Sequence, residues 1–83
     1  SKTVMKITDI ITIDKEIQSG TPVFKGTRVP VQTLFWHLEE GVTIDEFLDD
    51  FPSVSKDQVI QLLEFTNKII HTPEIIQMYE TVA

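Results

Sequence analysis

The same helix-start signature occurs twice in this chain, twelve residues apart. In each copy a Ser or Thr precedes a Glu or Gln by three residues, which is the spacing of a capping box. An apolar pair brackets each box at the spacing of a hydrophobic staple. The two copies are "VTIDEF" (42–47) and "VSKDQV" (54–59). Phe51-Pro52 lies between them and ends the first helix, because a residue before proline avoids helical geometry. Two closely spaced helices resemble a helix-turn-helix.

Apolar periodicity places a further helix before this pair and defines the inner face of the second member. Pro30 suits the first position of the earlier helix and Gly41 its end. Its apolar stripe consists of Val31, Leu34, Phe35 and Leu38. The last helix of the pair covers "KDQVIQLLEFTNKII" (56–70), with an inner face of Val59, Leu62, Leu63, Thr66, Ile69 and Ile70. A tail restarts as helix at Pro73.

The first third of the chain has strand signals. "DIITID" (9–14) is a β-branched run, and "TPVF" and "TRVPV" flank Lys25-Gly26 as the arms of a hairpin would. We therefore expect a mainly α fold, a three-helix, helix-turn-helix or winged-helix-like domain with a small N-terminal β-hairpin. It forms a single domain over residues 1–83, with an N-terminal segment (1–8), a core (9–70) and a C-terminal helical tail (71–83).

Length and charge restrict the environment and the partners of the chain. A chain of 83 residues buries only about 60–65% of its unfolded surface, so we expect it to form a homodimer or to bind a partner. It has no cysteine and no apolar run that spans a bilayer, from which we expect a cytoplasmic protein without membrane contact. Residues 1–38 carry five bases and three acids, whereas residues 39–83 carry two bases and ten acids. The acidic half suits a basic protein surface better than nucleic acid.

The sequence has no enzyme signature. His37 and His71 lie far apart without the spacing of metal ligands, and the adjacent carboxylate pairs (39–40 and 49–50) point in different directions on a helix. The three glycines occupy turn or cap positions rather than a phosphate-binding loop. We therefore expect no catalytic residues, no metal site and no cofactor.

Several exposed-looking residues are candidates for contacts. Trp36 lies off the apolar stripe, where it either anchors an interface or packs under the hairpin. Ile75, Ile76 and Tyr79 of the tail dock either on the body or on a partner. If the last helix of the pair enters a DNA groove, the hairpin and this helix supply the nucleic-acid contacts, namely Lys25, Arg28, Lys56, Gln58, Gln61 and Lys68. Only two of these cations, Lys56 and Lys68, lie on the helix itself, so DNA binding is the weaker hypothesis.

The pattern of residues 9–70 resembles a bacterial family, the domain of unknown function 433. The resemblance rests on "GTPVFKGTRVPV" (20–31), then a Gly, a capped acidic helix start, an aromatic-Pro pair and a second capped start. The matching positions are Gly20, Pro22, Gly26, Thr27, Arg28, Val31, Gly41, Thr43, Asp45, Glu46, Phe51, Pro52, Ser55 and Asp57. The resemblance implies a helix-turn-helix-like fold with a small β element.

The resemblance also implies a function. Many members of the family are interpreted as VapB-like antitoxins of type II toxin–antitoxin pairs, which bind and inhibit a PIN-like ribonuclease toxin and, in complex, operator DNA. The alternatives are a DNA-binding transcriptional regulator without a toxin and a structural subunit of a larger assembly. No catalytic site transfers from the family to this chain.

Three roles stay open for the cations of the hairpin. Lys25 or Arg28 enters the metal-binding carboxylate cluster of the nuclease, where the planar guanidinium pairs bidentately with a carboxylate. Alternatively, Arg28 pairs within the domain with Asp45 or Glu46. In the third role the hairpin is a wing whose two cations contact DNA phosphates.

Overall fold

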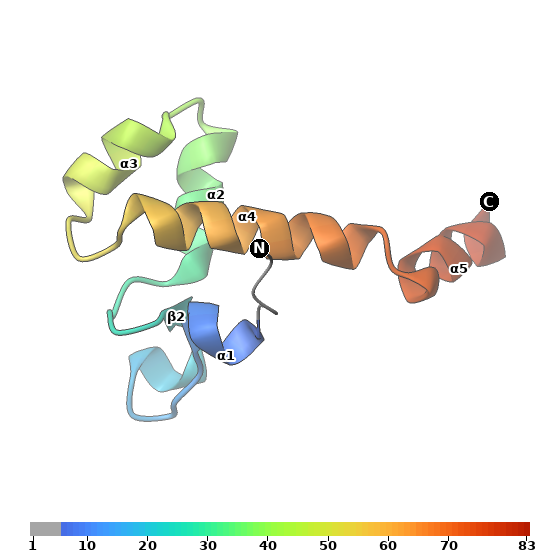
Figure 1. Cartoon of the computed structure of the whole chain (residues 1–83), viewed down its shortest axis with the longest axis horizontal. Coiled ribbons are helices and arrows are strands. Elements are labelled where there is room, and N and C mark those ends of the chain that lie inside the picture. The colour runs from blue at the N-terminus through green and yellow to red at the C-terminus, as the bar shows by residue number, and fades with distance from the viewer. Residues whose placement is uncertain (1–5) are drawn as a thin grey trace, which may run out of the picture.

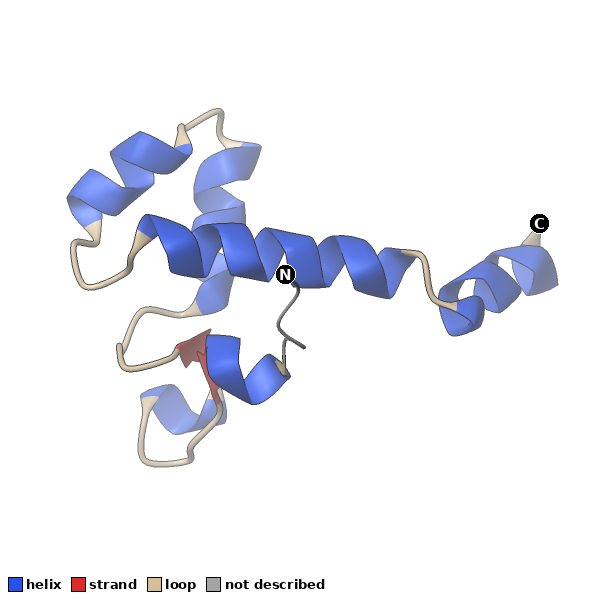
Figure 2. Cartoon of the chain, viewed as in Figure 1, coloured by secondary structure: helices blue, strands red, loops and turns tan. Residues whose placement is uncertain are grey.

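The computed structural model describes residues 6–83; the first five residues of the predicted N-terminal segment lie outside the described residues. The described chain is mainly helical with one small antiparallel sheet (Figures 1 and 2). This confirms the predicted fold class. The elements, in order, are α1 (Ile7–Ile10), β1 (Ile11–Thr12), the 3-10 turn η1 (Gln18–Gly20), β2 (Val23–Phe24), α2 (Val31–Glu39), α3 (Ile44–Asp50), α4 (Lys56–Ile70) and α5 (Pro73–Val82).

Both predicted capping boxes are present, and they set the starts of α3 and α4. Thr43 Oγ1 accepts a hydrogen bond from the Glu46 N–H at 3.1 Å, and Glu46 Oε1 accepts one from the Thr43 N–H at 2.9 Å. In the second box, Ser55 Oγ accepts from the Gln58 N–H at 3.1 Å and Gln58 Oε1 accepts from the Ser55 N–H at 2.9 Å. A short helix followed closely by a long one is therefore observed as the sequence predicts.

Helix α2 ends in the hydrogen-bond pair of a Schellman motif. The N–H of Val42 donates to the His37 carbonyl at 2.9 Å, and the N–H of Gly41 donates to the Leu38 carbonyl at 3.0 Å. Gly41 has a φ of +85°, which a glycine adopts without the penalty that a Cβ imposes. The predicted end is confirmed, whereas the start moves by one residue, because Pro30 is the extended N-cap.

The sheet is smaller than the sequence suggests. The prediction that "TRVPV" (27–31) is the second strand of the hairpin is wrong, because β2 pairs with β1 and residues 27–31 form no strand. Strands β1 and β2 pair Ile11 with Phe24, and β2 continues on its other side into an isolated bridge with Pro30. The prediction of a strand over 9–14 is wrong for Asp9 and Ile10, which belong to α1. A short β-branched run fits a strand and a buried helical turn equally well, so periodicity alone does not separate them.

Five elements and one turn supply one contiguous core. Its buried residues come from α1, β2, α2, α3, the α3–α4 turn and the first half of α4: Ile10, Phe24, Leu34, Phe47, Val54, Val59 and Leu62. Phe47 contacts the ring of Phe24 at a centroid distance of 6.3 Å and that of Phe51 at 4.9 Å. The core thus fixes the hairpin against the α3–α4 pair.

The end of α4 and all of α5 extend beyond this core (Figure 1). We call this part, residues 66–82, the arm. The prediction that Thr66, Ile69 and Ile70 belong to the buried inner face is wrong, because all three are exposed. They do lie on the predicted apolar stripe, but within the described residues no element of the body, residues 6–65, reaches far enough along α4 to cover it (Figure 1). Helix α5 starts at Pro73 as predicted, with Thr72 as its N-cap.

Candidate interaction surfaces

The turn of the hairpin is held by a dense set of hydrogen bonds. The Phe24 N–H donates to the Val29 carbonyl at 3.0 Å, and the Thr27 N–H donates back to the Phe24 carbonyl at 3.0 Å. The Thr27 hydroxyl donates to the Phe24 carbonyl at 2.8 Å and accepts from the Val29 N–H at 3.0 Å. Gly26 has a φ of +77°, which explains why a glycine stands there. The loop of residues 25–28, the cationic loop, therefore has one defined backbone conformation.

Two long-range contacts attach the cationic loop to the body. The Lys25 N–H donates to the Ile10 carbonyl at 2.9 Å, and the Lys25 carbonyl accepts from Gln58 Nε2 at 2.8 Å. Gln58 thus caps α4 through its oxygen and holds the loop through its nitrogen. The sequence predicted the cap but not the second contact, because the two residues are 33 positions apart.

The side chains of Lys25 and Arg28 are exposed on this rigid loop. Within residues 6–83 the ion pair found joins Lys56 Nζ and Asp45 Oδ1, at 3.9 Å. Asp45 therefore faces Lys56 rather than Arg28, and the carboxylate of Glu46 belongs to the Thr43 cap. The alternative in which Arg28 pairs with either acid is not what the structure contains. A shallow hollow beside the loop is lined by Arg28 together with Thr12, Ile17, Gly26, Thr27 and Ser53.

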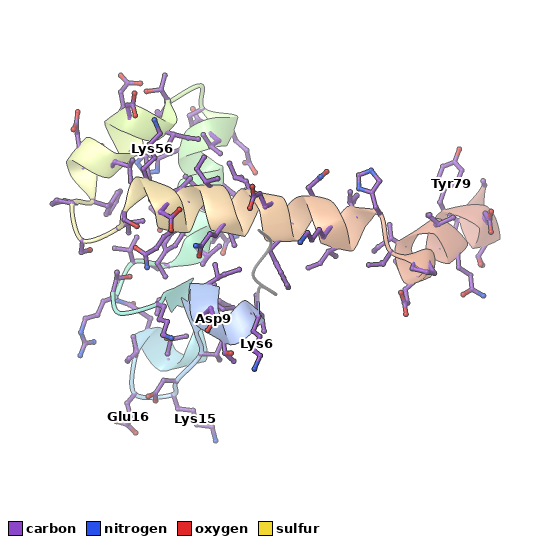
Figure 3. The ribbon with its side chains drawn as sticks, in the orientation of Figure 1. Lys6, Asp9, Lys15, Glu16, Lys56 and Tyr79 are labelled. Atoms are coloured by element: carbon purple, nitrogen blue, oxygen red, sulfur yellow. The ribbon has the colours of Figure 1, made fainter. Side chains whose placement is uncertain are left out.

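The helix-turn-helix pair offers little that reads DNA. Both candidate amides are engaged within the chain, since Gln61 Nε2 donates to Asp57 Oδ2 at 2.9 Å and Gln58 holds the cationic loop. Lys56 lies opposite Asp45 on the surface (Figure 3), and Lys68 lies on the arm. Among the predicted nucleic-acid residues, Gln58 therefore adjoins the cationic loop, whereas Lys68 lies apart from it on the arm.

One acidic residue of α3, Glu46, has a structural role. Glu46 Oε1 accepts from both the backbone N–H and the hydroxyl of Thr43, at 2.9 Å and 3.0 Å. The backbone hydrogen bond first, and then that of the hydroxyl, hold the pKa of Glu46 below its ordinary value.

Trp36 is 55% exposed on α2 and does not pack under the hairpin. It borders a hollow of about 330 Å³ together with Phe35 and Glu39 of the same helix and with Thr21, Pro22, Val31 and Gln32. An exposed indole beside a half-buried phenyl ring is a favourable anchor for a partner. Its neighbour His37 instead turns inward, with its ring edge-on to Phe47 at 5.4 Å and to Phe51 at 5.5 Å.

The arm holds the last group of predicted contact residues. Ile75 is half-buried, whereas Ile76 and Tyr79 are exposed, and Tyr79 stands on α5 far from the body (Figure 3). Within residues 6–83, Ile76 and Tyr79 do not pack on the body, and their contact with a partner stays a prediction. Sequence reasoning missed Met78 and Val82, which are equally exposed and apolar. The helical spacing of Met78 and Val82 relative to Ile75 and Tyr79 could have indicated that they share a face.

The described residues contain no group of three His, Cys, Asp or Glu side chains arranged to hold a metal ion. Among the helices of residues 6–83, none has the length and apolar character needed to cross a bilayer.

The fold and these surfaces define a small helical domain that pairs a helix-turn-helix-like unit with a cationic loop. The chain belongs to the family described as "Protein of unknown function (DUF433)", whose sequence model matches residues 11–66. This confirms the resemblance found from the motifs. The chain is 33% identical over 51 residues to "Uncharacterized protein y4eO" of Sinorhizobium fredii. The match covers 61% of this chain but only 23% of that relative. No solved structure matches this chain.

Proposed function

We propose that this chain is an antitoxin-like component of a type II toxin–antitoxin pair, which binds and inhibits a PIN-like ribonuclease. One observation carries the proposal: the cationic loop presents Lys25 and Arg28 to solvent from a backbone fixed by hydrogen bonds at 2.8–3.0 Å. A surface cation has no need of such a support for solubility alone. The loop has the properties of a preorganised contact with an anionic partner.

A metal-dependent nuclease offers a suitable anion. Enzymes of this class bind a divalent cation through clustered carboxylates, and a guanidinium placed there substitutes for the charge of the metal. Arginine suits the task because its planar fork donates two parallel hydrogen bonds to one carboxylate. In this proposal Arg28 enters the cluster and Lys25 contacts its rim, while Trp36 anchors a neighbouring contact.

The charges of the rest of the chain favour a protein partner over DNA. Residues 39–83 carry ten acids and two bases, and the base at the start of α4 already faces Asp45. A DNA-binding surface needs several cations near the phosphates, because their neutralisation supplies most of the affinity. The same acids complement the basic surface that an RNA-cutting enzyme presents to its substrate.

The test is co-expression of the chain with the product of its adjacent gene, followed by size-exclusion chromatography and a ribonuclease assay with Mg²⁺ or Mn²⁺. We expect co-elution and inhibition of the nuclease. Arg28→Ala should weaken binding by about 2 kcal/mol or more, roughly 30-fold, because it leaves a buried carboxylate unpaired. The matched control is Lys15→Ala, which removes an exposed cation from the turn after β1 (Figure 3) and should change nothing.

Other outcomes point elsewhere. Separate elution of the two proteins, or equal loss of binding in both variants, contradicts the proposal. Binding to the upstream DNA with a steep salt dependence, lost in Arg28→Ala, supports a transcriptional regulator instead. A lower melting temperature as the main effect of Arg28→Ala assigns the arginine a structural role.

A further inference from the structure

The apolar stripe of α4 does not stop where the core stops. Leu62 and Leu63 lie against the body, and seven residues further on the same face carries Ile69 and Ile70. The first pair is buried or half-buried, whereas the second is 42% and 56% exposed. One helix face therefore passes from the core into solvent without a change in its chemistry.

Helix α5 carries an exposed apolar face of its own. Ile75, Met78, Tyr79 and Val82 are spaced i, i+3, i+4 and i+7, which places them on one face. They border a shallow hollow along α5, shared with Glu74, Gln77 and Thr81. Tyr79 stands on α5 far from the body (Figure 3), and within the described residues it is 71% exposed. We call the exposed side chains of Ile69, Ile70, Ile76, Met78, Tyr79 and Val82 the arm face.

The six side chains of the arm face together expose a large apolar area. Its six side chains are 42% to 83% exposed, and a free side chain of this size presents of order 200 Å². Together they offer roughly 700 Å² per chain. The largest apolar patch of a typical monomer is about 300–600 Å², whereas each side of a standard protein–protein interface buries roughly 800 Å².

The charges of the arm are arranged around this face rather than on it. By helical spacing Lys68 lies on the opposite side of α4, and Glu74 and Glu80 flank the apolar side chains of α5. A partner with a basic surface would need acids within the contact area. An uncharged face meets an identical face without repulsion, as a two-fold symmetric contact requires.

We propose that the arm face is the homodimer interface of this protein, covered by the arm of a second copy. The contact is isologous, so each arm supplies the same six side chains to its partner. It leaves the cationic loop free, because the loop belongs to the opposite end of the molecule (Figure 1). The inference is independent of the proposed function.

Sedimentation equilibrium over a wide concentration range tests the proposal. We expect twice the chain mass for the unchanged protein. The double variant Ile70→Glu, Tyr79→Glu places two charges in each arm face and should raise the dimer dissociation constant at least about 100-fold. The control is Lys68→Glu, which makes a larger charge change per site on the other side of α4 and should leave the mass unchanged.

A milder variant guards against misfolding. Tyr79→Ser introduces no charge, alters an exposed position, and should weaken the dimer about tenfold. A monomer at every concentration for the unchanged chain overturns the proposal, as does a dimer that the double variant leaves intact. Loss of a toxin complex in the double variant, without any effect on self-association, would assign the arm face to the toxin. Failure of toxin binding with a persistent arm-dependent dimer would refute the proposed function alone.

Discussion

The two halves of α4 have the same apolar stripe and opposite surroundings. In the first half Val59 and Leu62 are buried against α1 and α3, whereas in the second half Ile69 and Ile70 face solvent. The residue types do not differ in hydrophobicity, so composition does not explain the contrast. What differs is whether another element lies opposite the stripe.

The comparison separates two kinds of information in a helical sequence. Periodicity defines which face is apolar, because side chains three and four positions apart share a face. Whether that face is buried depends on whether a neighbouring helix or strand extends far enough to pack against it. Helix α3 is only seven residues long, and at about 1.5 Å per residue it ends well before the fifteen-residue α4 does.

We expect the greatest difference in stability between two variants that each shorten one apolar side chain, one in the first half of α4 and one in the second. Leu62→Ala leaves a cavity among the core residues and should lower the free energy of unfolding by about 2–5 kcal/mol. Ile70→Ala removes a side chain that is mostly in water already, so it should cost less than about 1 kcal/mol. Urea unfolding, followed by circular dichroism on protein diluted below its self-association range, measures both.

Similar losses of stability in the two variants would mean that the arm packs on the body in solution, which contradicts the contrast between the two halves of α4. A loss of stability for Ile70→Ala that grows with protein concentration would instead show that Ile70 contacts a second copy. Such a dependence is expected only if a second copy stabilises the arm by mass action.

Local signals in the sequence predicted helices α2 to α5 well, but not α1. The two capping boxes define the starts of α3 and α4, and Gly41 defines the end of α2, because each acts through hydrogen bonds within a few residues. Gly26 likewise indicated a turn with positive φ. These features need no knowledge of the tertiary structure.

Features that depend on distant residues were not predictable in the same way. The hydrogen bond from Gln58 to the Lys25 carbonyl links residues 33 positions apart, and no local pattern announces it. The exposure of Ile69 and Ile70 depends on where α3 and α1 end in space. The replacement of a strand by α1 at Ile10 reflects a core that needs that side chain buried, whichever backbone conformation delivers it.

An intermediate effect is expected from removing a cap in the body and one in the arm. Thr43→Ala and Thr72→Ala each delete a side-chain acceptor at a helix start, which typically costs about 1 kcal/mol. In the body this loss should lower the global stability, because α3 unfolds with the core. In the arm it should only increase local opening of α5, which contributes no buried residue. Hydrogen exchange by NMR, again on dilute protein, distinguishes the two.

Equal global destabilisation by both caps would contradict this distinction between body and arm. The geometry already suggests a difference, since the Ile75 N–H lies 3.4 Å from Thr72 Oγ1 while the Glu46 N–H lies 3.1 Å from Thr43 Oγ1. The N3 residue of α5 is an isoleucine, which has no group to complete a box.

The smallest expected effect is a pH dependence confined to one cap. The folded chain holds the pKa of Glu46 below its ordinary value, through hydrogen bonds from Thr43. A depressed carboxyl pKa stabilises the fold above the unfolded pKa of about 4.3, and this stabilisation is lost as the pH falls through the folded value. Glu46→Gln should therefore flatten the acid side of the stability profile, since the α3 box then resembles the uncharged α4 box at Ser55 and Gln58.

Urea midpoints measured from neutral pH down to about pH 3 check this expectation, with the unchanged chain losing more stability than the variant. Asp49→Asn is the matched control because it removes one charge from α3 without removing a cap hydrogen bond. A slope altered equally by both substitutions would reflect net charge rather than the cap. Neither substitution should change the rate of hydrogen exchange in α5, because the arm contains no carboxylate in its cap and shares no core residue with α3. A pH response of α5 that tracks Glu46 would show that arm and body open as one unit.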